Sequence, residues 1–260
     1  MYSKEHQTYL KKRKKEKTII FLFQIIIIIS FIITWELLSK YNIINSFLFS
    51  SPSKIIKTII KLYNEKNLFN HIFITTYETL IGFSISSILG ILIASIFWWN
   101  NKIEKIFDPF LTILNSLPKI SFGPLIIIWA GANIKSIIII TILITTFTTI
   151  ISTYHAFKET DESKIILMKS FKATKTQIFT KLIFKSNIPT IKNILKINIS
   201  LSLIGVIMGE LLVSKQGLGY LITYGTQVFN LNLVITSIII LGLLSYILYL
   251  IVNKIIKYKN

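Results

Sequence analysis

Few residues of the types that catalyse reactions or bind metals occur at spacings that would bring them together. The three histidines, His6, His71 and His155, are far apart, and none forms a His-Glu-x-x-His pair. Cysteine is absent, which excludes disulfides and thiolate metal sites. The chain has no Gly-x-Ser-x-Gly elbow, and no glycine is followed by lysine, so it lacks a Walker-type phosphate loop. We expect no catalytic residues, no metal and no cofactor, and if ATP drives this protein, another chain must bind it.

Two acids inside apolar stretches remain as candidates, because an ionisable residue in a membrane span is expensive and by default marks function. They are Glu78 and Glu210. For Glu78 we favour a structural role, in which the side chain reaches the outer interface and pairs with a hydroxyl group or a lysine. For Glu210 this interpretation and a place on a translocation pathway both stay open.

The composition identifies a polytopic membrane protein. The chain has 260 residues, 52% of them hydrophobic and only 15% charged, with a mean hydropathy of +0.66. We expect an all-α protein with six transmembrane helices, over residues 18–38, 71–97, 106–130, 134–152, 188–213 and 231–252. A basic tail (1–17) precedes the first span, an external segment (39–70) follows it, and the core (71–252) ends in a short tail (253–260). The first span follows a basic stretch like that of a signal peptide, but no small-x-small cleavage site follows, so we expect it to be retained.

The distribution of the basic residues predicts the topology. With six spans both termini share one side, and most of the 29 lysines and arginines fall on that side, in the N-terminal tail and in the polar stretch 154–187. The positive-inside rule places both termini and this stretch in the cytoplasm. We expect the protein in the plasma or inner membrane of the cell. The net charge of +18 is then a topology signal and a contact with anionic lipid, and nucleic acid is not an expected partner.

The polar stretch 154–187 is too long for a simple connection between spans. Apolar Phe171, Ile178 and Leu182 recur at helical spacing, and Thr174 and Gln177 have the spacing of a capping box. This pattern predicts two short helices that meet near residues 172–174, outside the bilayer. Two interpretations stay open, a docking element for a protein partner and a solvated connector that rests on lipid headgroups.

Two further patterns lie within the predicted spans. Pro118, Gly123 and Pro124 interrupt the third span, which indicates either a kinked helix that lines a pathway or a bent packing helix. Gly205 and Gly209 form a Gly-x-x-x-Gly pattern, which lets another helix approach closely. We favour packing within the chain over a dimer seam for these glycines.

Many short motifs, in one order along nearly the whole chain, resemble the permease subunit of ATP-binding-cassette importers in the nitrate, sulfonate, taurine and bicarbonate branch. They are Trp35-Glu36-Leu37, Ser51-Pro52-Ser53, Thr75-Thr76, Gly82-Phe83, Gly90, Asp108-Pro109, Leu117-Pro118, the run 123–131, Lys135, Gly209-Glu210-Leu211-Leu212 and the run 217–222.

The family has a cytoplasmic loop with a Glu-Ala-Ala, three residues, Gly pattern that docks on the ATPase, and residues 154–187 lie where it should be. Here the Glu-Ala-Ala positions hold Ile166, Leu167 and Met168, the glycine position holds Lys172, and the usual Leu-Pro before the fifth span holds Phe184-Lys185. Lysine with a positive φ costs on the order of 1 kcal/mol, so the turn either differs from the family's or is strained. The resemblance implies that the coupling residues are Ile166, Leu167, Met168, Phe171, Lys172, Ala173, Thr174, Gln177 and Ile178.

The resemblance also implies the assembly and its action. Two permease copies, most simply a homodimer, would combine with two copies of an ATPase subunit and an external substrate-binding protein in the lipid bilayer. ATP binding would move the docked loop and switch the pathway, which Pro118, Gly123, Pro124 and Glu210 would line. The solute would be a sulfonate-, nitrate- or taurine-like anion or a small organic molecule such as a vitamin precursor. The alternatives are a membrane scaffold that uses the loop as a partner dock and, less favoured, an intramembrane enzyme.

Overall fold

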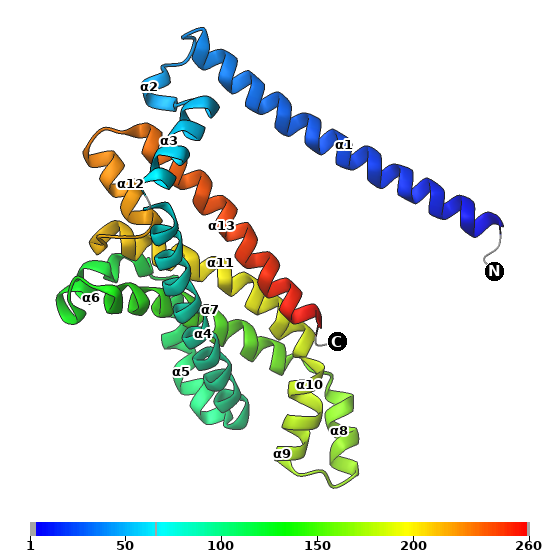
Figure 1. The fold of residues 1–260 in the computed structure, drawn as a ribbon. Helices are drawn as coiled ribbons and strands as arrows, with labels where there is room; N and C mark the ends of the chain where they lie inside the picture. Colours follow the sequence, from blue (N-terminus) through cyan, green and yellow to red (C-terminus); the bar gives the residue numbers. More distant parts are fainter. Residues whose placement is uncertain (1–3, 66, 259–260) are drawn as a thin grey trace.

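The computed structural model of the chain describes residues 4–65 and 67–258, and every regular element within these ranges is helical (Figure 1). In chain order the elements are α1 (Lys4–Lys40), α2 (Ser46–Phe49), α3 (Pro52–Asn64), α4 (Leu68–Trp99), α5 (Asn101–Ser116), the 3-10 helix η1 (Lys119–Phe122), α6 (Gly123–Ala130), α7 (Ile134–Lys158), α8 (Glu162–Ser170), α9 (Lys175–Gln177), the π-helix η2 (Ile178–Ile183), α10 (Phe184–Ser186), α11 (Ile188–Val213), α12 (Leu218–Gln227) and α13 (Leu231–Tyr258).

Five helices of the described residues are long and apolar enough to cross a membrane: α1, α4, α7, α11 and α13. A sixth candidate is the pair formed by α5 and the segment Lys119–Ala130, which bends by 89° at a short break. Counted as one broken span, the pair completes the six spans that the sequence predicted. The fold class, an all-α polytopic membrane protein, is confirmed.

The core of the bundle is formed by α4, α7 and α11, which pack tightly against one another. Small residues allow this close approach. A methyl group added at Gly205 of α11 would lie 2.8 Å from Cα of Thr141 in α7, and one added at Gly209 would lie 3.0 Å from Cα of Ile137. The Gly-x-x-x-Gly pattern therefore faces a neighbouring helix of the same chain.

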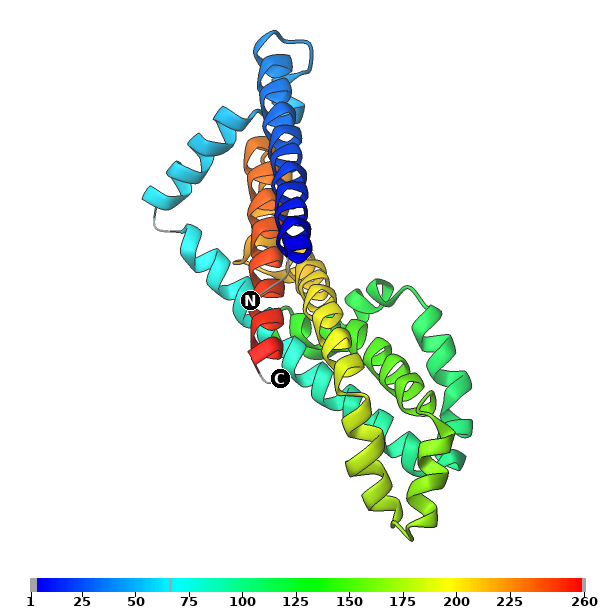
Figure 2. The ribbon, with the colours of Figure 1, turned by 90° about the vertical axis from the view of Figure 1, so that its right-hand side faces the viewer.

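Helix α1 stands apart from this core (Figures 1 and 2). Its contact with the rest of the chain is near its C-terminal end, where the carboxylate of Glu36 accepts hydrogen bonds from the backbone N–H of Ser53 (3.0 Å) and from its hydroxyl group (2.8 Å). Ser51 caps α3, whose first residue is Pro52. Leu, Ile and Phe side chains are exposed along the apolar part of α1, as expected of a helix surrounded by lipid.

Several predicted element bounds need correction. Helix α1 runs without a break from Lys4, so the basic tail is helical and continuous with the first span. Helix α7 continues to Lys158, because Tyr154, Ala156 and Phe157 bury their side chains in the bundle, and the loop proper therefore begins at Glu159. Helix α13 likewise continues to Tyr258. The bounds of α11 agree with the prediction.

The third span was predicted as one kinked helix, and this is wrong in its geometry. The chain breaks at Leu117 and Pro118, where the backbone is extended, and the 89° bend makes two separate segments. Gly123 and Pro124 do not interrupt a helix. They open α6, where proline at the first turn lacks only an N–H that would have no helical partner.

Candidate functional site: the loop between helices α7 and α11

The α7–α11 loop, residues 159–187, forms a helical hairpin that projects from the bundle at the end opposite to the α12–α13 turn (Figure 1). Its first helix, α8, is capped by Asp161, whose side chain accepts a hydrogen bond from the backbone N–H of Ser163 at 2.9 Å. Its start and end are joined, because the side-chain amide of Asn187 donates to Thr160 Oγ1 at 2.7 Å. The loop is therefore an ordered element whose two ends are held together at the bundle.

The turn of the hairpin has the geometry that glycine usually provides. Lys172 has φ +56°. The N–H of Ala173 donates to the carbonyl of Met168 (3.0 Å), and the N–H of Lys172 donates to that of Lys169 (2.8 Å). These two bonds define a Schellman motif with Lys172 in the left-handed position. The turn thus keeps the shape expected of the family, and its lysine is strained.

The second arm of the hairpin begins with the predicted capping box, which is confirmed. Thr174 Oγ1 accepts from the N–H of Gln177 at 3.3 Å, and Gln177 Oε1 accepts from the N–H of Thr174 at 2.9 Å. The chain then passes through the π-helix η2, a form that is rare and often found at functional sites. Ile178 and Ile183, at the two ends of η2, are buried.

The predicted coupling residues divide into two sets. Ile166 and Leu167 on α8 and Phe171 at its C-terminal end are exposed, with Phe171 75% exposed, and we call these three the apolar tip. Met168, Ala173 and Ile178 instead pack into the cluster that holds the hairpin together. Lys172, Thr174 and Gln177 are exposed and shape the turn. Ala173 is partly buried, and its part in coupling stays a prediction.

Aromatic residues attach the loop to the bundle, and the sequence interpretation did not identify this role. Phe179 of η2 lies 5.0 Å from Trp98 and 5.8 Å from Trp99 at the end of α4, measured between ring centroids, and 5.6 Å from Phe157 of α7. The ammonium group of Lys175 donates to the backbone carbonyl of Trp99 and lies over both tryptophan rings. These contacts connect the loop directly to α4 and α7.

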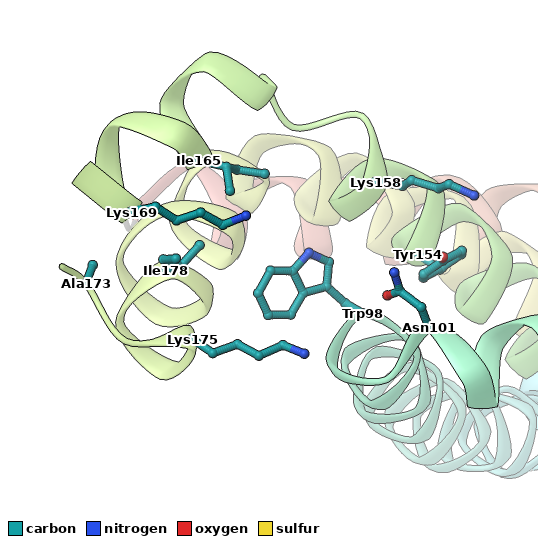
Figure 3. A pocket seen from close by; sticks show the side chains of 9 residues that line it. All are labelled: Trp98, Asn101, Tyr154, Lys158, Ile165, Lys169, Ala173, Lys175 and Ile178. Atoms are coloured by element: carbon teal, nitrogen blue, oxygen red, sulfur yellow. The ribbon is translucent and has the colours of Figure 1, made fainter. Parts of the chain in front are cut away.

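A cavity of about 570 Å³ lies between the hairpin and the ends of α4 and α7 (Figure 3). Trp98 stands in its centre, with Lys169 above and Lys175 below in the view of the figure. Lys158, at its edge, pairs with Glu104 of α5 at 3.7 Å. The hairpin thus touches the bundle at its aromatic contacts and leaves open space beside them.

Three of the residues predicted to line a pathway precede the α7–α11 loop in the chain, and they differ in how far they are buried. Pro118 and Pro124 are exposed, whereas Gly123 is buried against Leu212 of α11, whose Cδ1 would be 2.7 Å from an added methyl group. Helix α5 carries exposed apolar residues along its length, among them Ile106, Phe110 and Ile113. A pathway role for Pro118, Gly123 and Pro124 stays a prediction.

Glu210 is buried where α4, α11 and α12 meet. Its carboxylate accepts hydrogen bonds from Thr75 Oγ1 (2.7 Å) and from the N–H of Gly219 (2.5 Å), at the N-terminal end of α12. A side chain at Gly217 would overlap this carboxylate, and Gly217 also has φ +102°. This geometry gives Glu210 an anchoring role, and a contact with solute stays a prediction.

Glu78 was expected to reach the outer interface, and this is wrong. Its side chain is fully buried in α4, and neither carboxylate oxygen has a hydrogen-bond donor among the described residues. It borders a second cavity, of about 230 Å³, together with Asn133, Lys215 and Gln216.

Comparisons with known proteins agree with this architecture. Residues 86–258 match the family model described as "Binding-protein-dependent transport system inner membrane component". The formylaminopyrimidine transport permease protein ThiX of Halalkalibacterium halodurans is 31% identical over 239 residues, which cover 92% of each chain. The putative aliphatic sulfonates transport permease protein SsuC of Bacillus subtilis is 24% identical over 230 residues, 87% of this chain and 83% of that protein.

Among solved structures, the inward-facing MetNI methionine ABC transporter contains a chain with the same fold. It superimposes with a TM-score of 0.65 at 18% identity, over 74% of this chain and 96% of that chain. The predicted function at the level of the family is confirmed: the protein is a membrane-spanning permease subunit of an ABC importer and forms the translocation pathway for a small solute. The chain therefore belongs to the family of binding-protein-dependent transport system inner membrane components.

Proposed function

We propose that the α7–α11 loop is the site at which a separate ATPase subunit drives this permease. The observation that carries the proposal is the apolar tip: Ile166 and Leu167 on α8 and Phe171 at its C-terminal end are exposed, and capping and Schellman hydrogen bonds hold the adjoining turn in place. Large apolar side chains on a rigid protrusion are typical of residues that fill a pocket in a partner. The chain has no nucleotide-binding loop of its own, so a partner must supply the energy of ATP.

The charges around the apolar tip indicate the chemistry of the partner surface. Lys164, Lys169, Lys172, Lys181 and Lys185 are exposed on the hairpin. Among the described residues of the loop, one of these lysines has an ion pair, Lys164 with Asp161 at 4.0 Å. A groove with an apolar floor and acidic rims on the ATPase would complement this surface. With the loop docked on a cytoplasmic ATPase, the loop and both termini lie in the cytoplasm.

We further propose that two copies of the chain form the pathway between them. Before the bend, α5 exposes Phe107, Phe110 and Ile113. After the bend, the segment Lys119–Ala130 exposes Ile128 and Trp129. A second copy would cover part of this surface, and the bend at Pro118 would then lie beside the pathway. An external binding protein would deliver the solute to the opposite end of the bundle.

For the solute we propose a small nitrogen heterocycle related to a vitamin precursor, with an aliphatic sulfonate as the second candidate. The support is the greater identity and coverage of the formylaminopyrimidine permease compared with the aliphatic sulfonate permease. Uptake into proteoliposomes that contain the complete transporter, with each compound offered to its binding protein, separates the two. Uptake of the sulfonate without uptake of the heterocycle would contradict this ranking of the two candidate solutes.

The experiment for the loop compares two substitutions of matched exposure. Phe171 and Phe229 are both 75% exposed, but Phe229 lies in the α12–α13 turn, at the other end of the molecule (Figure 1). Phe171→Glu places a charge in the proposed apolar contact, and burying an unpaired charge costs several kcal/mol, enough to abolish a moderate interface. We expect Phe171→Glu to insert normally but to lose co-purification with the ATPase and solute-stimulated ATP hydrolysis.

Phe229→Glu is the control and is expected to retain co-purification with the ATPase, because its position is remote from the proposed docking contact. Membrane abundance of the two variants is measured alongside, so that a folding defect is separated from lost coupling. Normal ATPase binding and hydrolysis with Phe171→Glu would refute the docking role of the apolar tip.

A further inference from the structure

Two carboxyl groups meet inside the bundle. Glu78 of α4 and Glu210 of α11 have exposed fractions of 0% and 1%. Thr75 lies one turn before Glu78 on the same face of α4 and donates to Glu210 Oε1 at 2.7 Å, which places the two buried carboxyl groups side by side. Because ionised carboxylates only accept hydrogen bonds, two ionised groups in this position would have no bond between them.

The environments of the two groups differ. Glu210 accepts from Thr75 Oγ1 and from the N–H of Gly219, and the positive end of the α12 dipole also favours a negative charge there. Glu78 has no such donor, and both of its oxygens are buried and unpartnered among the described residues. The surroundings of Glu210 therefore suit a hydrogen-bond acceptor. Glu78 needs a proton before it can form a hydrogen bond with Glu210.

No ion pair among the described residues involves Glu78 or Glu210. The ion pairs of the described residues are Lys61–Glu65, Lys158–Glu104 and Lys164–Asp161, all of them elsewhere. Titratable groups on the adjoining segments include His71 of α4, Tyr220 of α12 and Lys215, which borders the cavity beside Glu78. Nδ1 of His71 accepts a hydrogen bond from the N–H of Gly217 at 2.9 Å, and Tyr220 stacks on the His71 ring.

Lys215 and Glu78 border the same cavity of about 230 Å³. The ammonium group of Lys215 and the carboxyl group of Glu78 are more than 4 Å apart, so they do not form an ion pair. Helix α7 faces the cavity with the apolar side chains of Ile134 and Ile137.

We propose that Glu78 and Glu210 form a proton-binding site in which one proton, carried by Glu78, is donated to the carboxylate of Glu210. Two adjacent carboxyl groups in an apolar interior cannot both be ionised without a large repulsive energy, so they share a proton. The bond joins α4 to α11 and, through the N–H of Gly219, to the start of α12. The cavity beside Glu78, bordered by the polar residues Asn133, Ser214 and Gln216, supplies a route by which the proton exchanges with water.

The proposal stands apart from the coupling role of the loop, and its test needs neither ATPase nor solute. Infrared spectra of the purified full-length chain in lipid nanodiscs distinguish the carbonyl stretch of a protonated carboxylic acid from that of a carboxylate. At about pH 7 exposed acids are ionised. We expect the wild-type chain to show a protonated carboxylic acid band that shifts in D₂O.

Glu78→Gln should remove this band and preserve the fold, because the amide nitrogen donates to Glu210 where the acid hydroxyl did. Glu78→Asp keeps a carboxyl group at the site and should keep a band at a shifted frequency. The control is Glu104→Gln, since Glu104 is also buried but pairs with Lys158, and it should leave the band unchanged. Absence of the band from the wild-type chain, or its persistence in Glu78→Gln, would overturn the proposal.

Discussion

Replacing Lys172 with glycine is expected to stabilise the turn of the α7–α11 loop. Lys172 has φ +56° and is held there by the hydrogen bonds from its own N–H and from that of Ala173. A side chain with a Cβ in this conformation costs about 1–2 kcal/mol. Glycine avoids that cost, but its greater freedom in the unfolded loop offsets about 0.4–1 kcal/mol. The expected net gain is therefore about 0–1.6 kcal/mol, with a midpoint of about 0.8 kcal/mol.

The assay is amide hydrogen exchange of the loop, because local opening exposes the N–H groups of residues 172 and 173. A gain of about 1 kcal/mol slows their exchange about fivefold. Lys172→Ala is the control, since it removes the charged side chain but keeps the Cβ and hence the strain. Exchange that is equally fast in the glycine and alanine variants would refute the assignment of strain to the left-handed backbone.

Three further predictions follow from the fold. Single cysteines at Ser163 and Gln216, in a chain that otherwise has none, should be labelled from opposite sides of the membrane, and labelling from one side would contradict the topology. Pro118→Ala should reduce solute uptake more than membrane abundance, because Pro118 is exposed at the bend and buries little, whereas equal losses would indicate a packing role. Gly209→Val should cost about 1–3 kcal/mol of stability by overpacking against α7, and Gly242→Val, with no atom within 4 Å of an added methyl group, should not; thermal unfolding in detergent compares them.

Local signals in the sequence were sufficient for the elements whose ends are set by nearby residues. The bounds of α11 follow from the polar residues before Ile188 and the proline in its first turn. The capping box at Thr174 and Gln177 requires two residues three positions apart, and both are visible in the sequence. The same holds for Ser51 and Pro52 at the start of α3.

Features that depend on contacts between distant segments were not predictable. The polar neighbours of Tyr154 and Phe157 suggested that the fourth span had ended, but those two side chains pack on α4 and η2 and extend α7. The break at Pro118 was visible, whereas its 89° angle depends on how α6 packs against α7 and α11.

The same limit applied to the candidate sites. The resemblance to the permease family placed Ala173 among the coupling residues but did not show that its side chain packs against the cluster inside the hairpin. Glu78 and Glu210 are more than 100 residues apart, and nothing in the sequence alone brings the two acids together. The contact of Phe179 with Trp98 and Trp99 is also long-range, and an aromatic residue within a basic stretch was the only local signal for it.

The central claim, that an ATPase docks on the apolar tip, is tested most directly by cross-linking. Because the chain contains no cysteine, single cysteines at Leu167, Ile178 and Gln216 give three probes: the exposed tip, the buried side of the hairpin and the opposite end of the molecule. We predict that Leu167→Cys cross-links to the ATPase in the assembled transporter, and that Ile178→Cys and Gln216→Cys do not. Cross-linking at Gln216, or its absence at Leu167 in an active complex, would contradict the account.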